Sequence, residues 1–238
     1  MSKPAYRRVM VKVSGEALMG TETYGLHAPT IGRIAEDLAA VRKSGIDVVV
    51  VVGGGNLIRG AQLAETGINR AAADQMGMLA TVMNALALET AIQRTKATVR
   101  VLSAVAMPSV CEPYSRQTAL KHLKEGHILL LAGGTGQPFF TTDTGAALRA
   151  CELECDAIFK ATNVDGVYDS DPRKDRNAKR LDRLTHDEAL AKDLKVMDAA
   201  AFALAREARL PIIVFSIREK NAIADAVRGV GRSTLVEP

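Results

Sequence analysis

The sequence lacks tryptophan, is poor in aromatic residues and contains three cysteines. Cys111, Cys151 and Cys155 form an odd set without a C-x-x-C pair, which argues against a disulfide framework or a zinc ribbon. Cys151 and Cys155 have a helical spacing that would let two thiols share a metal, but the four histidines supply no companion motif. We therefore expect two small thiols that serve packing.

Long apolar runs are also missing. No run approaches the roughly 20 residues that a membrane-spanning helix needs. The first residues lead into a predicted strand rather than into the apolar core of a signal peptide, so the expectation is a cytoplasmic enzyme. The net charge of +4 is small, and Lys and Arg are scattered among acids. This pattern favours small anionic ligands over nucleic acid or membrane.

Several familiar catalytic motifs are absent. Residues 20–25 have the glycine spacing of a Walker A loop, but Leu26 stands where the lysine should be. Residues 53–55 begin like a dinucleotide-binding G-x-G-x-x-G, yet Ile58 takes the place of the third glycine. The sequence has no G-x-S-x-G, no H-E-x-x-H and no Cys/His pair at a meaningful spacing. Hydrolysis through a covalent nucleophile therefore has little support.

Strand and helix patterns alternate along the 238 residues. This alternation predicts an α/β fold with a mainly parallel central sheet sandwiched between helices, in one domain spanning 1–238. The predicted strands are residues 8–14, 48–52, 99–103, 128–132, 157–161, 212–216 and 234–236. The predicted helices are about 29–44, 69–95, 116–125 with Ser115 as N-cap, 142–153, 186–192, 198–208 and 221–228.

The most informative stretch is residues 48–59, in which five valines are followed by three glycines and then Arg59. Such a β-branched run predicts a strand that is buried on both faces. Polar or glycine-rich sequence follows four predicted strands, at residues 12–15, 53–59, 133–143 and 160–171. Because the carboxyl ends of parallel strands share one edge, we expect a ligand site there. Backbone N–H groups near an arginine favour a phosphate.

Six segments carry the most distinctive sequence: KVSGEA at 12–17, GGGNLIRG at 53–60, NRAAADQMGMLATVM at 69–83, TGQPFFTTD at 135–143, KATNVDGV at 160–167 and LKVMDAAAF at 194–202. In this order they resemble the bacterial uridylate kinases of the amino acid kinase superfamily over nearly the whole chain. The resemblance implies direct in-line transfer of the ATP γ-phosphate to UMP, with Mg²⁺ and without a covalent intermediate. It also implies a role in pyrimidine nucleotide biosynthesis, a homohexamer, activation by GTP and inhibition by UTP.

Phosphoryl transfer depends on positioning and charge stabilisation rather than on a nucleophilic side chain. The acceptor phosphate, with a second pKa of about 6, is mostly ionised at neutral pH and needs no general base. The resemblance assigns catalysis to Lys12, Arg59, Lys160 and Asp198. The plainer alternatives are a solvated lysine at a strand end and a helix cap at Asp198.

The resemblance also assigns binding residues. A UMP lobe would span roughly 1–155 and an ATP lobe roughly 156–238. ATP would contact Lys12, Val13, Ser14, Gly15, Gly55, Arg59, Thr162, Asn163, Tyr168 and Asp171. UMP would contact Gly54, Asp74, Thr135, Gly136, Gln137, Pro138, Phe139, Phe140, Thr141 and Thr142. GTP would bind Gly20, Thr21, Glu22, Thr23, Tyr24 and Gly25, which otherwise form a surface loop.

Several roles have alternatives at this stage. Asp74 would bind the UMP ribose or simply complement a helix dipole. Phe139 and Phe140 are expected to be partly core and partly pocket wall. Asp143 is either a dipole-complementing acid or part of the nucleotide and metal site. The methionine-rich face of helix 69–95 would form an oligomer interface or pack in the core of its own chain.

Two other functions compete with UMP phosphorylation. Another amino acid kinase would make an acyl or carbamoyl phosphate, but such acceptors carry no ribose for Asp74 to bind. A non-catalytic nucleotide-binding or oxyanion-binding protein on the same fold would not need Lys12, Arg59 and Asp198 together.

Overall fold

The computed structural model describes residues 5–58, 67–170, 172, 174–194 and 196–238. Its elements, in chain order, are β1 (Arg8–Val13), the 3₁₀ helix η1 (Gly15–Met19), α1 (Ala28–Lys43), β2 (Asp47–Val52), α3 (Arg70–Arg94), β3 (Val99–Ser103), β4 (Glu112–Pro113), α4 (Arg116–Lys124), β5 (Ile128–Ala132), α5 (Thr142–Glu152), β6 (Ala157–Thr162), β7 (Val167–Tyr168), β8 (Arg180–Leu181), β9 (Arg183–Thr185), α6 (His186–Ala191), α7 (Ala199–Glu207), β10 (Ile212–Ser216), α8 (Ala222–Val227) and β11 (Ser233–Glu237). In these residues no helix is long and apolar enough to cross a membrane.

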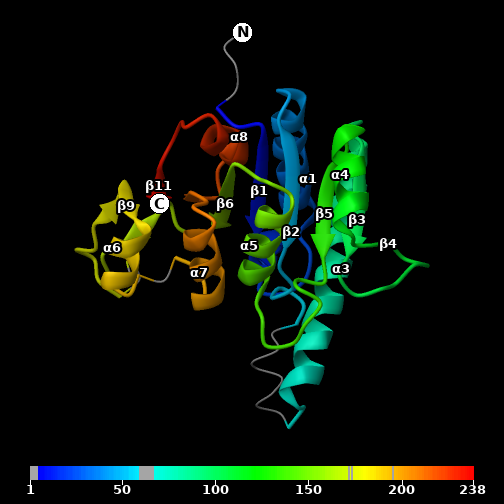
Figure 1. Ribbon diagram of the computed structural model, residues 1–238, viewed down its shortest axis with the longest axis horizontal. Helices are drawn as coiled ribbons and strands as arrows, with labels where there is room; N and C mark the ends of the chain where they lie inside the picture. The colour runs from blue at the N-terminus through cyan, green and yellow to red at the C-terminus, as the bar shows by residue number, and fades with distance from the viewer. Residues whose placement is uncertain (1–4, 59–66, 171, 173, 195) are drawn as a thin grey trace.

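A central sheet lies between two layers of helices (Figure 1). Within the described residues it has the strand order β4-β3-β5-β2-β1-β6-β10-β11-β9. The pair β10–β11 is antiparallel and the other pairs in this sheet are parallel. The predicted α/β sandwich with a mainly parallel sheet is therefore confirmed.

The valines of β2 explain how the two layers meet the sheet. Val48, Val50 and Val52 pack into the layer that contains α1, α3 and α8. Val49 and Val51 face the layer that contains α4, α5 and α7. All five are at most 2% exposed, because successive strand side chains point to opposite faces and both faces are covered. The uninterrupted run is thus the consequence of a doubly covered strand.

The predicted element positions agree closely with the structure. The strands at 99–103, 128–132 and 212–216 match to the residue, and the other predicted elements shift by only one or two residues at their ends. The short strands β4, β7, β8 and β9 were missed, because two or three residues cannot show a periodic pattern. Within the polar segment 162–183, Val167 belongs to the core, at 8% exposed. Its N–H donates to Thr234 Oγ1 at 2.8 Å.

Helix α3 positions one wall of the site. Asn69 caps it by accepting a hydrogen bond from the Ala72 N–H at 2.9 Å. Its 25 residues make a helix about 37 Å long. Figure 1 shows its first turns projecting past the carboxyl ends of the strands, beside the segment that links β5 to α5. Asp74 stands in these projecting turns.

Candidate active site

The four polar segments predicted to converge follow neighbouring strands. In the sheet order, β5, β2, β1 and β6 are adjacent and parallel, so their carboxyl ends form one continuous edge. The turns after β1 and β2 pack backbone against backbone. A Cβ on Gly15 would lie 2.6 Å from the Gly55 nitrogen, and one on Gly53 would lie 2.8 Å from the Gly15 nitrogen. Glycine at these positions is therefore a steric requirement of the edge.

Two lysines share one carboxylate at this edge. Lys12 on β1 is the register partner of Lys160 on β6. The alternation of strand side chains turns both lysines toward the face that α5 covers, and Asp143 lies in the first turn of α5. The Asp143 oxygens Oδ1 and Oδ2 each lie 2.7 Å from one ammonium, that of Lys12 and that of Lys160 respectively. Lys160 also donates to the Val196 carbonyl at 2.6 Å.

The electrostatics of this trio favour an anionic ligand. Burial by itself would raise the pKa of Asp143, but attraction to Lys12 and Lys160 outweighs it and the pKa is lowered. Burial lowers the pKa of Lys160, the attraction of Asp143 opposes this, and the neighbouring charge of Lys12 adds to it. Two cations thus contact a single shared anion, and an incoming phosphate would relieve their mutual repulsion.

Asp198, the N-cap of α7, contacts the same N-terminal turn of α5 that carries Asp143. Its Oδ1 caps α7 by accepting the N–H groups of Ala200 and Ala201, both at 3.0 Å. The carboxylate also accepts hydrogen bonds from the hydroxyls of Thr141 and Thr144. These threonines belong to the N-terminal turn that carries Asp143. Asp198 is therefore both a helix cap and a support for the lysine–carboxylate cluster, which it contacts through α5.

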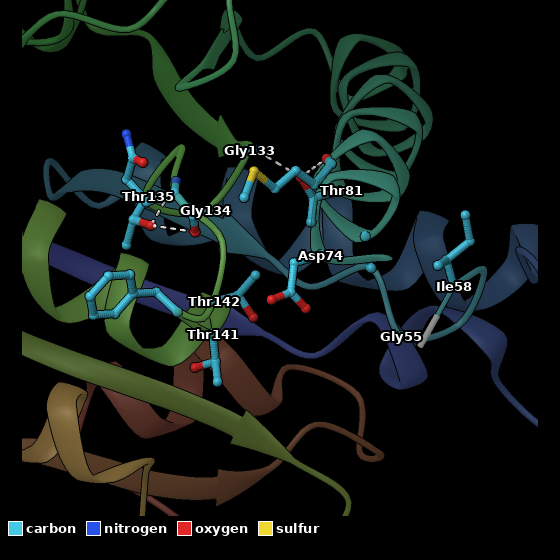
Figure 2. Close-up of a pocket in the computed structure, with 14 residues that line it drawn as sticks. Gly55, Ile58, Asp74, Thr81, Gly133, Gly134, Thr135, Thr141 and Thr142 are labelled. Atoms are coloured by element: carbon cyan, nitrogen blue, oxygen red, sulfur yellow. Dashed lines mark hydrogen bonds between the residues drawn. The ribbon is translucent and has the colours of Figure 1, made fainter. Parts of the chain in front are cut away.

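A cavity of about 240 Å³ opens beside the cluster, between α3 and the segments after β2 and β5 (Figure 2). Eight predicted site residues line it: Gly54, Gly55, Asp74, Thr135, Gln137, Phe140, Thr141 and Thr142. Gly136, Pro138 and Phe139 do not line it. Phe139 and Phe140 are 67% and 51% exposed, so the expectation that they are partly core is wrong.

Asp74 is the one acidic side chain that lines this cavity within the described part of the chain. It projects from α3 toward the segment that carries Thr141 and Thr142 (Figure 2). Both of its oxygens accept from Arg70 Nε at 2.9 Å, and Oδ2 also accepts the Phe139 N–H at 2.8 Å. The Arg70 guanidinium lies 5.8 Å from the centre of the Phe139 ring. These contacts hold the carboxylate at the mouth of the cavity.

Sequence reasoning missed the residues that brace the glycine turns. Asn84 on α3 is fully buried and donates to the Gly53 carbonyl and to Asn56 Oδ1, both at 2.6 Å. Asn56 in turn donates to the Gly25 carbonyl at 2.8 Å and accepts the Gly25 N–H through its own carbonyl. Thr81 accepts the Gly133 N–H at 2.7 Å. A polar residue on the inner face of an apolar helix was the signal that could have found Asn84 and Thr81.

The residues expected to surround the nucleoside of ATP lie at the end of β6 and after it, two strands from β2. Thr162 Oγ1 donates to the Val164 carbonyl at 2.6 Å, and the Tyr168 hydroxyl donates to Asp165 Oδ1 at 2.6 Å. Asn163 is exposed. None of these three lines the cavity near Asp74, so they form a separate polar region beside Lys160. Arg59 and Asp171 lie outside the described residues.

The other predicted groups have less to do with the cavity. Residues 20–25 follow η1 as an exposed turn, with Tyr24 at 68% exposure, and Asn56 joins that turn to the glycine segment after β2. Cys155 lies beyond the end of α5, so Cys151 and Cys155 do not share a helix, contrary to their spacing. Burial raises the pKa of both thiols, that of Cys155 to about 12. Both are packing residues.

The fold and this edge define a phosphate-handling α/β protein. Residues 7–216 match the amino acid kinase family, and the chain belongs to that family. Its relatives include the uridylate kinase of Azorhizobium caulinodans, 64% identical over 98% of each chain, and that of a Bradyrhizobium species, 58% identical over 99% of each. The UMP kinase of Ureaplasma parvum superposes with a TM-score of 0.94 at 37% identity over 100% of both chains. The UMP kinase of Bacillus anthracis gives 0.93 at 37% identity, covering 99% of this chain and 97% of that one.

Proposed function

We propose that this chain is an ATP-dependent uridylate kinase that transfers the γ-phosphoryl group of ATP to UMP and produces UDP and ADP for pyrimidine nucleotide synthesis. The observation that carries the proposal is the position of Lys12 and Lys160. Lys12 lies on β1, between β2, whose following glycines line the cavity with Asp74, and β6, which carries Lys160 and leads into the second polar region. A donor bound on one side and an acceptor on the other would bring their phosphates to the two ammonium groups.

In this scheme UMP binds in the cavity, with its ribose hydroxyls at Asp74 and its phosphate near Gly54. ATP binds along the segment after β6, with Thr162, Asn163, Tyr168 and Asp171 around the nucleoside. Lys12, Lys160 and Arg59 offset the repulsion between the two polyanions, which is the main barrier to bringing them together. An acceptor lobe of residues 1–155 and an ATP lobe of residues 156–238 follow from this division.

Transfer is proposed to be direct and in line. Ser14, two residues after Lys12, accepts the Ala17 N–H as the N-cap of η1, and we assign it no covalent role. The acceptor phosphate is already ionised, so lysine and backbone donors need only orient and neutralise. An isotope-exchange assay tests this: ADP should not exchange into ATP unless UMP is present, and exchange without UMP would contradict direct transfer.

Mg²⁺ is proposed to arrive with ATP. Asp143 does not fit a direct metal ligand in this arrangement, because each of its oxygens faces a lysine ammonium at 2.7 Å. Mg²⁺ prefers to keep several waters and to use substrate phosphates as ligands. When bound it would screen charge on the ATP phosphates, whereas the lysines act on the transferred group.

An acceptor panel tests the assignment. ATP is offered with UMP, CMP, acetylglutamate, aspartate or carbamate, and ADP release is measured with a coupled assay. We expect release with UMP far above that with the other acceptors. Preference for an acyl or carbamoyl acceptor would identify another amino acid kinase, and no release with any acceptor would identify a binding protein.

Assembly and regulation are the finer parts of the proposal. Met76, Leu79 and Met83 are 36–56% exposed along one face of α3, which suits an interface between copies in a homohexamer. Light scattering should then give six times the chain mass.

GTP is proposed to activate through residues 20–25, which Asn56 joins to the glycine turn, and UTP to inhibit. Initial rates with each nucleotide added separately test both effects.

A further inference from the structure

Three titratable side chains meet far from the lysine–carboxylate edge, at the corner between α4 and β5. His122 lies in α4, Glu125 is its C-cap, and His127 directly precedes β5. Gly126, with φ of 87°, makes the turn that brings the two histidines together. The five residues of β5 separate this corner from the glycines of the site by about 16 Å.

The distances within this cluster suit a tetrahedral metal ion. Nδ1 of His122 lies 3.3 Å from Glu125 Oε2, and Nδ1 of His127 lies 3.7 Å from the same oxygen. Each of the three residues offers a ligand atom within 4.8 Å of the other two. In tetrahedral zinc sites, bonds of about 2.0–2.1 Å to nitrogen and oxygen separate neighbouring ligand atoms by about 3.3–3.4 Å. Small side-chain adjustments would therefore complete the geometry.

Glu112 supplies the supporting contact that metal-binding histidines usually have. Its Oε2 lies 2.9 Å from His122 Nε2. Because an ionised carboxylate only accepts, this contact suits the tautomer with its proton on Nε2, which leaves Nδ1, facing Glu125, to bind a metal. A carboxylate that fixes the histidine tautomer in this way recurs in zinc proteins. The side chains of His122 and His127 are 10% and 15% exposed, whereas that of Glu125 is 43% exposed. An ion could therefore enter from the solvent past Glu125.

The charges near the cluster also fit a dication. Two carboxylates, Glu112 and Glu125, face two imidazoles, and a divalent ion would neutralise them. Two arginines near the cluster are engaged: Arg42 Nε donates to the Gly126 carbonyl at 2.9 Å, and Arg100 lies 3.7 Å from Oε1 of Glu112. Nδ1 of His127 is 3.2 Å from the His122 carbonyl, and metal binding would replace that contact.

We propose that His122, Glu125 and His127 bind one Zn²⁺ per chain, with water as the fourth ligand and Glu112 orienting His122. Two imidazoles and one carboxylate favour a borderline transition metal over Mg²⁺, which prefers oxygen ligands. The ion would fasten the end of α4 to the start of β5 and, through Glu112, to the edge strand β4. It would serve the structure of the sheet edge and not the transfer reaction.

The test uses the full chain without nucleotides and Zn²⁺ alone, titrated by calorimetry. We expect one site per chain. Glu125→Gln and His127→Gln should each weaken Zn²⁺ binding at least about 100-fold. Glu112→Gln should weaken it by about 10- to 100-fold, which is the usual cost of losing a residue that hydrogen-bonds a metal ligand. His27→Gln is the matched control, since His27 contacts Thr30 outside the cluster. Its affinity should equal that of the parent, and excess Mg²⁺ should not compete.

A second measurement guards against misfolding. The metal-free variants should unfold at the same urea concentration as the metal-free parent. Co²⁺ in the parent should give the visible absorption of a tetrahedral site, and His127→Gln should lose it. Absence of stoichiometric Zn²⁺ binding by the parent would overturn the proposal and leave a cluster of hydrogen-bonded ion pairs. Undiminished binding in Glu125→Gln and His127→Gln would overturn it as well.

Discussion

Asp143→Asn isolates the shared carboxylate of the lysine cluster. The substitution keeps the size of the side chain and its place in the first turn of α5, but removes the negative charge that lies 2.7 Å from both ammonium groups. Lys12 and Lys160 then remain buried without a counterion. We expect a large loss of stability in the ligand-free protein, which a bound phosphate partly restores.

The magnitude follows from the geometry of neighbouring strands. Because Lys12 and Lys160 are register partners on β1 and β6, their charges lie roughly 5 Å apart. At an effective dielectric constant of about 20, their repulsion is about 3 kcal/mol. Removing one partner of a buried ion pair typically costs about 3–5 kcal/mol, which agrees with this value. The side chains are only 10–16% exposed, so solvent screening reduces it little.

Urea unfolding measures the loss, and the double variant with Lys160→Met identifies its cause. If repulsion between the lysines dominates, Lys160→Met should recover most of the stability that Asp143→Asn loses. A cost below about 1 kcal/mol, or equal costs with and without Lys160, would refute the reasoning.

The same variant has a predicted pH signature. The pKa of Asp143 is lowered in the folded chain, so its contribution is fully present above the unfolded pKa of about 3.9 and is lost as pH falls through the lower folded pKa. The parent should therefore lose stability below pH about 4 more steeply than Asp143→Asn. Parallel acid unfolding curves would contradict the assignment.

Three further substitutions probe the supports of the site. Asp74→Asn should raise the KM for UMP much more than the KM for ATP. Arg70→Ala should raise the KM for UMP by about twofold to fivefold and change the free energy of unfolding by no more than about 1 kcal/mol, because the Arg70 side chain is 47% exposed. Equal shifts in KM for both substrates would count against the ribose role. Asn84→Ala should cost about 2–3 kcal/mol in urea unfolding, because the Gly53 carbonyl loses a buried donor. Asp198→Asn should lower kcat at least roughly tenfold, about 1.4 kcal/mol, and an unchanged kcat would remove Asp198 from the mechanism.

The sheet and the location of the site could be predicted because each follows from a local pattern. Five valines require a strand covered on both faces, and the glycines after them require backbone contact at its end. The rule that parallel strands share a carboxyl edge then placed four separate segments together. The sequence does not state strand order, yet the four segments follow adjacent strands in the structure.

The contacts inside the site could not be predicted, since they join residues far apart in the chain. Nothing near Asp143 in the sequence indicates that both of its oxygens face lysines from two strands. The bracing by Asn84 depends on the rotation of α3 over the sheet, which tertiary packing decides. His122 and His127 were set aside because neither matches a familiar spacing, although a single glycine turn brings them to the same carboxylate.

On the proposed function, the lysine cluster would make the edge suit two phosphates better than one. Asp143 pairs with both Lys12 and Lys160, so both ammonium groups keep an ionic partner before nucleotides bind. A phosphate that approaches from either side competes with Asp143 for one lysine and leaves the other paired. Only when donor and acceptor are both present can both lysines face phosphate oxygens, with Asp143 still offsetting part of their charge. In the proposed mechanism the lysines would therefore bind the phosphates most strongly while charge moves from one nucleotide to the other, when transfer requires it.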